Sequence, residues 1–108
     1  MNKLALIRVL GDALAAIDTA IGSLLPSDPH QQQLQELRAL LDDQQRKLSQ
    51  QAFEENTPAF QSAARQLKEV NDEIQTTVRE VQRIEAVIDN IKRFVDSVAT
   101  LLGPVVPA

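Results

Sequence analysis

The side chain best suited to acid–base or metal chemistry in this chain is its single histidine, His30. It follows Asp28 and Pro29, a pair that favours a helix start, because Asp is a good N-cap and Pro fits the first helical position. The positive end of the helix dipole disfavours a charged imidazole there, so we interpret His30 as a surface residue beside the cap. A zinc site built from nitrogen and sulfur ligands needs several His or Cys side chains. With one His and no Cys, the sequence predicts neither a metal centre nor a cofactor.

The carboxylates that could take part in catalysis occur as adjacent pairs, at Asp42-Asp43, Glu54-Glu55 and Asp72-Glu73. Neighbouring residues on a helix point about 100° apart, so these pairs do not face one another as an acid and a base would. The chain has no Glu-x-x-His motif for a di-iron site, no Gly-rich phosphate loop and no available histidine to activate a Ser or Thr nucleophile. We therefore expect no enzymatic activity.

Composition and charge argue against nucleic-acid binding and against a membrane span. The 108 residues carry a net charge of −4 with both signs interspersed, whereas nucleic-acid binders present a basic face. The longest uncharged stretch, 97–108, has twelve residues, against about 18–20 for a membrane helix. Lys3 and Arg8 precede an Ala- and Leu-rich run, but Asp12 and Asp18 interrupt it before a signal-peptide core is complete. We expect a cytoplasmic protein.

The first half of the chain predicts a helical hairpin. Apolar residues recur at intervals of three and four through a first helix over 2–25, which Pro26 ends: Ile7, Leu10, Leu14, Ile17, Ile21 and Leu24. A second helix over 29–55 has a thinner seam: Leu34, Leu37, Leu41, Gln44, Leu48 and Gln51. The short connection between the two helices favours antiparallel packing. We interpret the many Gln residues of the second helix as a solvated face.

The strongest pattern in the sequence is a heptad repeat over 58–102, which Pro58 can begin and Gly103-Pro104 can end. Steps of seven give one apolar series: Phe60, Leu67, Ile74, Val81, Ile88, Val95 and Leu102. A second series lies three residues later: Ala63, Val70, Thr77, Ile84, Ile91 and Val98. The repeat predicts a third helix on the order of 65 Å long with a single apolar seam. Thr77, its polar member, either fixes register or bonds the carbonyl of Glu73.

The second half of the third helix carries the candidate functional surface. The hairpin is long enough to cover this helix only to roughly residue 85. Beyond that point the apolar face widens, because the positions before each heptad residue change from Gln66, Glu73 and Glu80 to Val87, Phe94 and Leu101. We name the resulting surface the C-terminal stripe, and it consists of eight residues: Val87, Ile88, Ile91, Phe94, Val95, Val98, Leu101 and Leu102.

Two arrangements would cover the C-terminal stripe. In one, the third helix breaks near Thr76-Thr77 and folds back to complete a four-helix bundle. In the other, the helix continues and the stripe packs on another chain. A Thr-Thr pair weakens a helix only mildly, so we favour the second arrangement.

The sequence therefore predicts an all-α, elongated helical bundle: one domain over 1–108, with an antiparallel hairpin packed on a long heptad-patterned third helix and an apolar tail over 103–108. We expect a non-enzymatic structural or protein–protein interaction module, a homo-oligomer of coiled-coil type that self-associates through the C-terminal stripe. One alternative is an adaptor or inhibitor that binds a different protein through the same stripe. Another is a membrane-associating helical protein, which the lack of Trp and Tyr and the presence of Asp89 and Asp96 disfavour.

Overall fold

A computed structural model describes residues 2–79 and 84–103, which contain four helices and no strand. The helices are α1 (Lys3–Gly22), α2 (Pro29–Gln50), α3 (Pro58–Thr77) and α4 (Ile84–Leu102). The all-α helical bundle predicted from the sequence is thus confirmed. In the described part of the chain, no helix combines the length and hydropathy that a membrane crossing requires.

The helices α1, α2 and α3 each begin at a side-chain cap. The side-chain oxygens of Asn2, Asp28 and Thr57 accept hydrogen bonds from backbone N–H groups in the first turns of α1, α2 and α3, at 2.9, 2.9 and 3.2 Å. Such caps satisfy donors that have no partner within the helix, and Pro29 and Pro58 supply preformed first residues for α2 and α3. The helix starts predicted at Pro29 and Pro58 are therefore confirmed.

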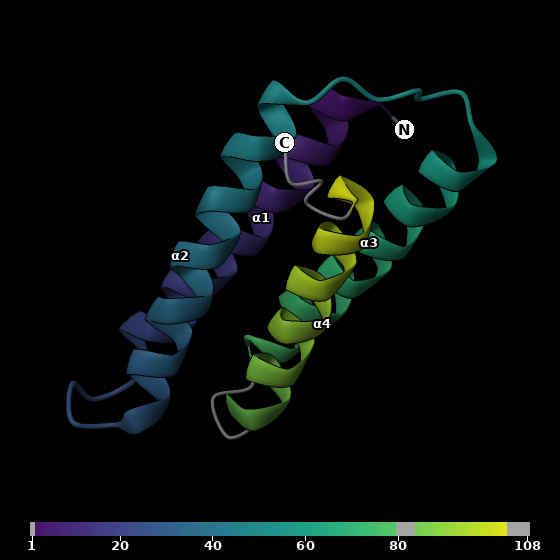
Figure 1. Ribbon diagram of the computed structural model, residues 1–108. Coiled ribbons are helices and arrows are strands. Elements are labelled where there is room, and N and C mark those ends of the chain that lie inside the picture. Colours follow the sequence, from purple (N-terminus) through teal and green to yellow (C-terminus); the bar gives the residue numbers. More distant parts are fainter. Residues whose placement is uncertain (1, 80–83, 104–108) are drawn as a thin grey trace.

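The helices form two antiparallel hairpins packed side by side (Figure 1). One hairpin is α1–α2 and the other α3–α4, while α1 also packs on α3 and α2 on α4. In the α1–α2 hairpin, the Arg38 guanidinium donates to the Asp18 carboxylate at 2.6 Å, and this contact raises the pKa of Arg38 above its ordinary value. Figure 1 shows the connection from α2 to α3 crossing over one end of the bundle.

The predicted third helix over 58–102 is not continuous in this structure. Its first half is α3, which ends at Thr77, and its second half is the separate helix α4, which begins at Ile84 and packs back along α3. The molecule measures 43 × 30 × 18 Å, shorter than the ~65 Å of an unbroken helix. The fold-back covers within one chain an apolar face that the long helix would have exposed. The hydrophobic effect therefore favours it.

Thr77 is the last residue of α3. Its hydroxyl donates to the Glu73 carbonyl at 2.9 Å, one of the two roles predicted for it. Thr76 makes the same bond to the Asp72 carbonyl at 3.0 Å. Such back-bonding to the preceding turn weakens a helix slightly.

The first two helices end earlier than predicted, at Gly22 instead of residue 25 and at Gln50 instead of residue 55. Lys3 explains the second difference. Its ammonium donates to the carbonyls of Ser49 and Gln51 at 3.2 and 3.1 Å, which satisfies carbonyl groups at the end of α2. Its backbone N–H donates to the Glu55 carboxylate at 2.8 Å, so the segment after α2 is attached to the start of α1.

One apolar core runs through all four helices. Its buried members from α1 are Leu6, Leu10, Ala13, Leu14, Ala16, Ile17 and Ala20, and from α2 they are Leu34, Leu37, Leu41 and Leu48. From α3 they are Phe60, Ala64, Leu67, Val70 and Ile74, and from α4 they are Val87, Ile88, Ile91, Phe94 and Val98. Each helix therefore buries one stripe at the spacing that the sequence predicts for helices.

Glutamine side chains add polar contacts between neighbouring helices. Gln45 of α2 donates to the Ile7 carbonyl of α1 at 3.2 Å, and Gln44 donates to the Val95 carbonyl of α4 at 3.0 Å. Gln75 of α3 donates to the Asp12 carbonyl of α1 at 3.0 Å. The interpretation of the Gln residues of the second helix as a solvated face is therefore wrong for Gln44 and Gln45.

Phe94→Ala is expected to lower the free energy of unfolding by about 3–5 kcal/mol, because the Phe94 ring is 0% exposed and its removal leaves a cavity. Leu40→Ala is the matched control at a side chain that is 54% exposed, and we expect a change within about 0.5 kcal/mol. Urea denaturation followed by circular dichroism measures both. Equal effects of the two substitutions would contradict the position of α4 in the core.

Candidate functional site

The structure places the whole C-terminal stripe on α4, on the side of this helix that packs against the core. Val87, Ile88, Ile91, Phe94 and Val98 are 0–3% exposed. Val95, Leu101 and Leu102 are half-buried and pack against the same core. All eight residues predicted as an interface therefore lie on one side of α4, and the surfaces that cover them are α2 and α3 of the same chain.

The expectation that the C-terminal stripe projects beyond the hairpin is wrong for this arrangement. The width of the stripe has a geometric cause, since α4 packs on two helices at once. A helix with two neighbours needs apolar residues over a broader face than a coiled-coil seam provides. Val87 and Phe94, which widen the stripe, are accordingly among the buried residues.

The contact between α2 and α4 contains a polar group that is not fully satisfied. The Gln44 amide donates to the Val95 carbonyl at 3.0 Å, while its own oxygen Oε1 is buried and has no hydrogen-bond partner among the described residues. A second amide, that of Gln51, donates to the Leu102 carbonyl at 3.3 Å. From the first contact to the second, the residue number rises by seven on each helix. The helices α2 and α4 therefore run parallel.

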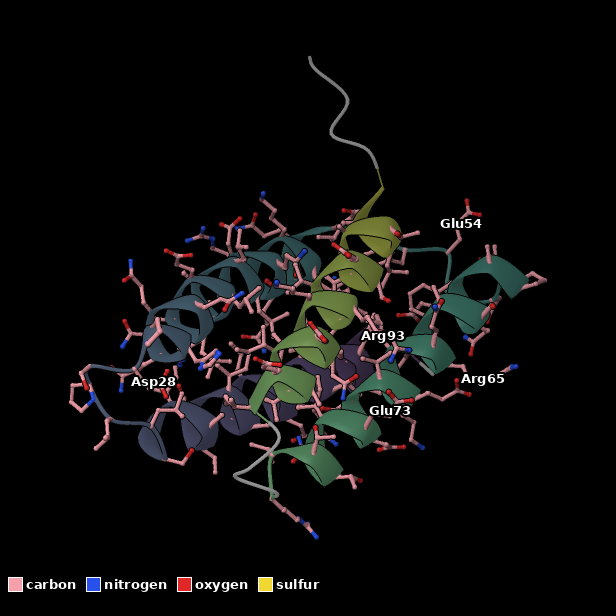
Figure 2. The ribbon with its side chains drawn as sticks, turned by 90° about the horizontal axis from the view of Figure 1, so that it is seen from below. Asp28, Glu54, Arg65, Glu73 and Arg93 are labelled. Carbon is pink, nitrogen blue, oxygen red and sulfur yellow. The ribbon has the colours of Figure 1, made fainter. Side chains whose placement is uncertain are left out.

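The contact between α3 and α4 has an ion pair at its surface. The Arg93 guanidinium donates to the Glu73 carboxylate at 2.9 Å, and both side chains are more than half exposed, at 58% and 53%. Figure 2 shows these two side chains on neighbouring helices. An exposed pair contributes about 0–1 kcal/mol, so its effect on the stability of the bundle is small.

Open grooves lie between α4 and its neighbouring helices. One, of about 640 Å³, lies between α3 and α4 and is lined by Asp72, Glu73, Asp89 and Arg93 among others. Another, of about 510 Å³, lies between the C-terminal ends of α2 and α4 and is lined by Gln44, Lys47, Gln51, Ala99 and Leu102 among others. Within the described residues, no group of three or more His, Cys, Asp or Glu side chains is placed to hold a metal ion.

His30 lies in the first turn of α2, whereas the residues that contact the C-terminal end of α4 lie at the opposite end of α2. Its backbone N–H and its ring nitrogen Nδ1 both lie 2.9 Å from Asp28 Oδ1. The imidazole is half-buried beside the cap, as the sequence interpretation placed it. Figure 2 shows Asp28 at the turn between α1 and α2, away from Arg93 and Glu73.

Two polar residues, Gln44 and Asn71, lie within the bundle, and sequence reasoning did not identify the contacts that they make. Gln44 falls at a seam position of α2, between Leu41 and Leu48, and that position was the available signal for its burial. Asn71 is 6% exposed on α3, and its side-chain oxygen accepts from the Gln75 amide at 3.3 Å. Gln75 also donates to α1, so these two residues link α3 to α1.

Gln44→Leu is expected to raise the free energy of unfolding by about 1 kcal/mol, because it removes a buried acceptor without a partner and places apolar surface against α4. Gln45→Leu is the matched control, since it removes a similar bond to the Ile7 carbonyl without relieving a buried unpaired atom. We expect no gain from the control. Urea denaturation measures the free energy of unfolding of both variants. If Gln44→Leu lowers it more than Gln45→Leu does, the Gln44 amide stabilises the bundle and the prediction is contradicted.

Comparison of the chain with models of known protein families, with curated proteins and with solved structures found no match. The contacts described above are therefore the basis for a proposal about function.

Proposed function

We propose that this chain is a non-enzymatic structural or protein–protein interaction module that self-associates through the C-terminal stripe on α4. Two observations support the non-enzymatic part: the one histidine contacts a helix cap, and the carboxylates that are adjacent in sequence do not face one another when they lie on a helix. The eight apolar residues of α4 support the choice of surface.

The observation that carries the proposal is the phase of the apolar residues across α3 and α4. Ile74 and Ile88, both buried, lie two heptads apart, and Thr77 and Ile84, at the facing ends of the two helices, lie one heptad apart. Two helices joined by a turn have no need of a common phase, because each can rotate independently to face the core. A single helix that presents one seam to a partner does need it.

The energy available to α4 is large enough for an interface. Burying a Val, Leu, Ile or Phe side chain contributes ~1.5–3 kcal/mol, so the C-terminal stripe offers on the order of 10 kcal/mol before association costs. The C-terminal stripe can be buried in the groove of its own chain or in that of another copy. The two burials are equivalent when the groove is formed by the same residues of α2 and α3.

The sequence analysis gave two alternative functions, which remain predictions and which experiments can distinguish from self-association. An adaptor or inhibitor would bind a different protein through the C-terminal stripe and stay monomeric by itself. A membrane-associating protein would sediment with liposomes. The cytoplasmic location also remains a prediction.

Light scattering coupled to size-exclusion chromatography tests self-association directly. For the full chain of 11.9 kDa, we expect a species at an integral multiple of that mass. Its share should increase with protein concentration and after refolding at high concentration, because association is driven by mass action.

The control is sedimentation with anionic and with neutral liposomes, in which the protein is expected to stay in the supernatant. A mass of 11.9 kDa at every concentration, also after refolding, would contradict self-association.

A further inference from the structure

We infer that two copies of this chain associate by exchanging α4, with α3 and α4 of each copy joined into one continuous helix. The inference rests on the proposed self-association and adds to it the partner, a second copy of the chain, and the stoichiometry. In such a dimer, α4 of each copy occupies on its partner the place that it occupies on its own chain in Figure 1.

The end of α3 is the first reason. Val78, which follows the last residue of α3, has φ −64° and ψ −22°, and its N–H donates to the Ile74 carbonyl at 2.9 Å. Val78 therefore continues the helical geometry. By contrast, Gly103 follows α4 with φ +79°, the left-handed conformation that stops a helix, and Gln51 follows α2 with an extended ψ of 137°.

The sequence between the helices is the second reason. Residues 78–83 read Val-Arg-Glu-Val-Gln-Arg and contain none of the Gly, Pro, Asn, Asp or Ser residues that favour turns. The other two connections contain Pro26 with Asp28, and Asn56 before Pro58.

The environment of α4 is the third reason, because an exchange can reproduce it. The groove that receives α4 is formed by α2 and α3, and both remain in place when α4 leaves. The Gln44 amide would again meet the Val95 carbonyl, and Arg93 would again meet Glu73, now between two chains. A reciprocal exchange closes after two copies, so it yields a symmetric dimer and not a filament.

A chemical cross-link between α3 and α4 distinguishes exchange from any other dimer. The chain has no cysteine, so Glu73→Cys with Arg93→Cys introduces the only two thiols, at side chains that are more than half exposed. The dimer is isolated after refolding at high concentration and treated with a short bismaleimide. With exchange, the linked positions belong to different chains, and we expect a covalent dimer on a denaturing gel.

The matched control is Asp18→Cys with Arg38→Cys, a surface pair that joins α1 to α2. These two helices stay in one chain whether or not α4 is exchanged. The control dimer should therefore give only internally linked single chains on the same gel. A covalent dimer from the control would show that the reagent links chains without regard to α4.

The two proposals fail in different ways. If a dimer forms but the Glu73/Arg93 cysteine pair links only within single chains, exchange is overturned and self-association stands. If no species above 11.9 kDa forms under any condition, self-association itself is overturned.

Arg79 supplies a second, independent test without cross-linking. Arg79 is exposed and lies beyond the end of α3, but it would lie inside the continuous helix of the exchanged dimer. Glycine disfavours a helix about fivefold relative to alanine, and the dimer contains the position twice. Arg79→Gly should therefore raise the dimer dissociation constant about 20-fold relative to Arg79→Ala, with the thermal midpoint of the monomer unchanged. Equal dissociation constants for the two variants would overturn the continuous helix.

Discussion

The arrangement of the bundle depends on the need to remove the apolar face of α4 from water. That face is too broad for one neighbour, so α4 lies against α2 and α3 together, and this contact sets the two hairpins side by side. Hydrophobic burial is not directional, so it requires a cover for the face without specifying which chain provides it.

The parts of the fold that could be predicted from sequence are those that local chemistry determines. Asp28 with Pro29 and Thr57 with Pro58 mark helix starts through their caps, and apolar spacing identifies the buried side of each helix. The prediction of an all-α bundle followed from these features. All of them act within a few residues along the chain.

The reversal between α3 and α4 could not be predicted from the same kinds of signal. The heptad phase is unchanged from Ile74 to Ile88, so periodicity describes one helix and two helices equally well. Nothing at Val78 stops the helix, and the two arrangements differ only in which chain covers the C-terminal stripe. The eight residues of the stripe lie on α4 and pack against the core of their own chain, which was the arrangement that the sequence favoured less. The reach of Gln44 to α4 was likewise missed, because it depends on which helix lies next to α2.

The amide contacts between helices have a consequence for the surroundings in which the bundle keeps its shape. A carboxamide carries no charge at any pH that proteins encounter, and dissolved salt does not screen its bond to a carbonyl as it screens exposed ion pairs within a Debye length of about 10 Å at 0.1 M. Low pH or high salt would weaken the exposed ion pairs Asp18–Arg38 and Glu73–Arg93. The amide hydrogen bonds of Gln44, Gln45 and Gln75 would remain. The rotation of each helix about its own axis is thus set by neutral groups, and the bundle can present one geometry in very different ionic media.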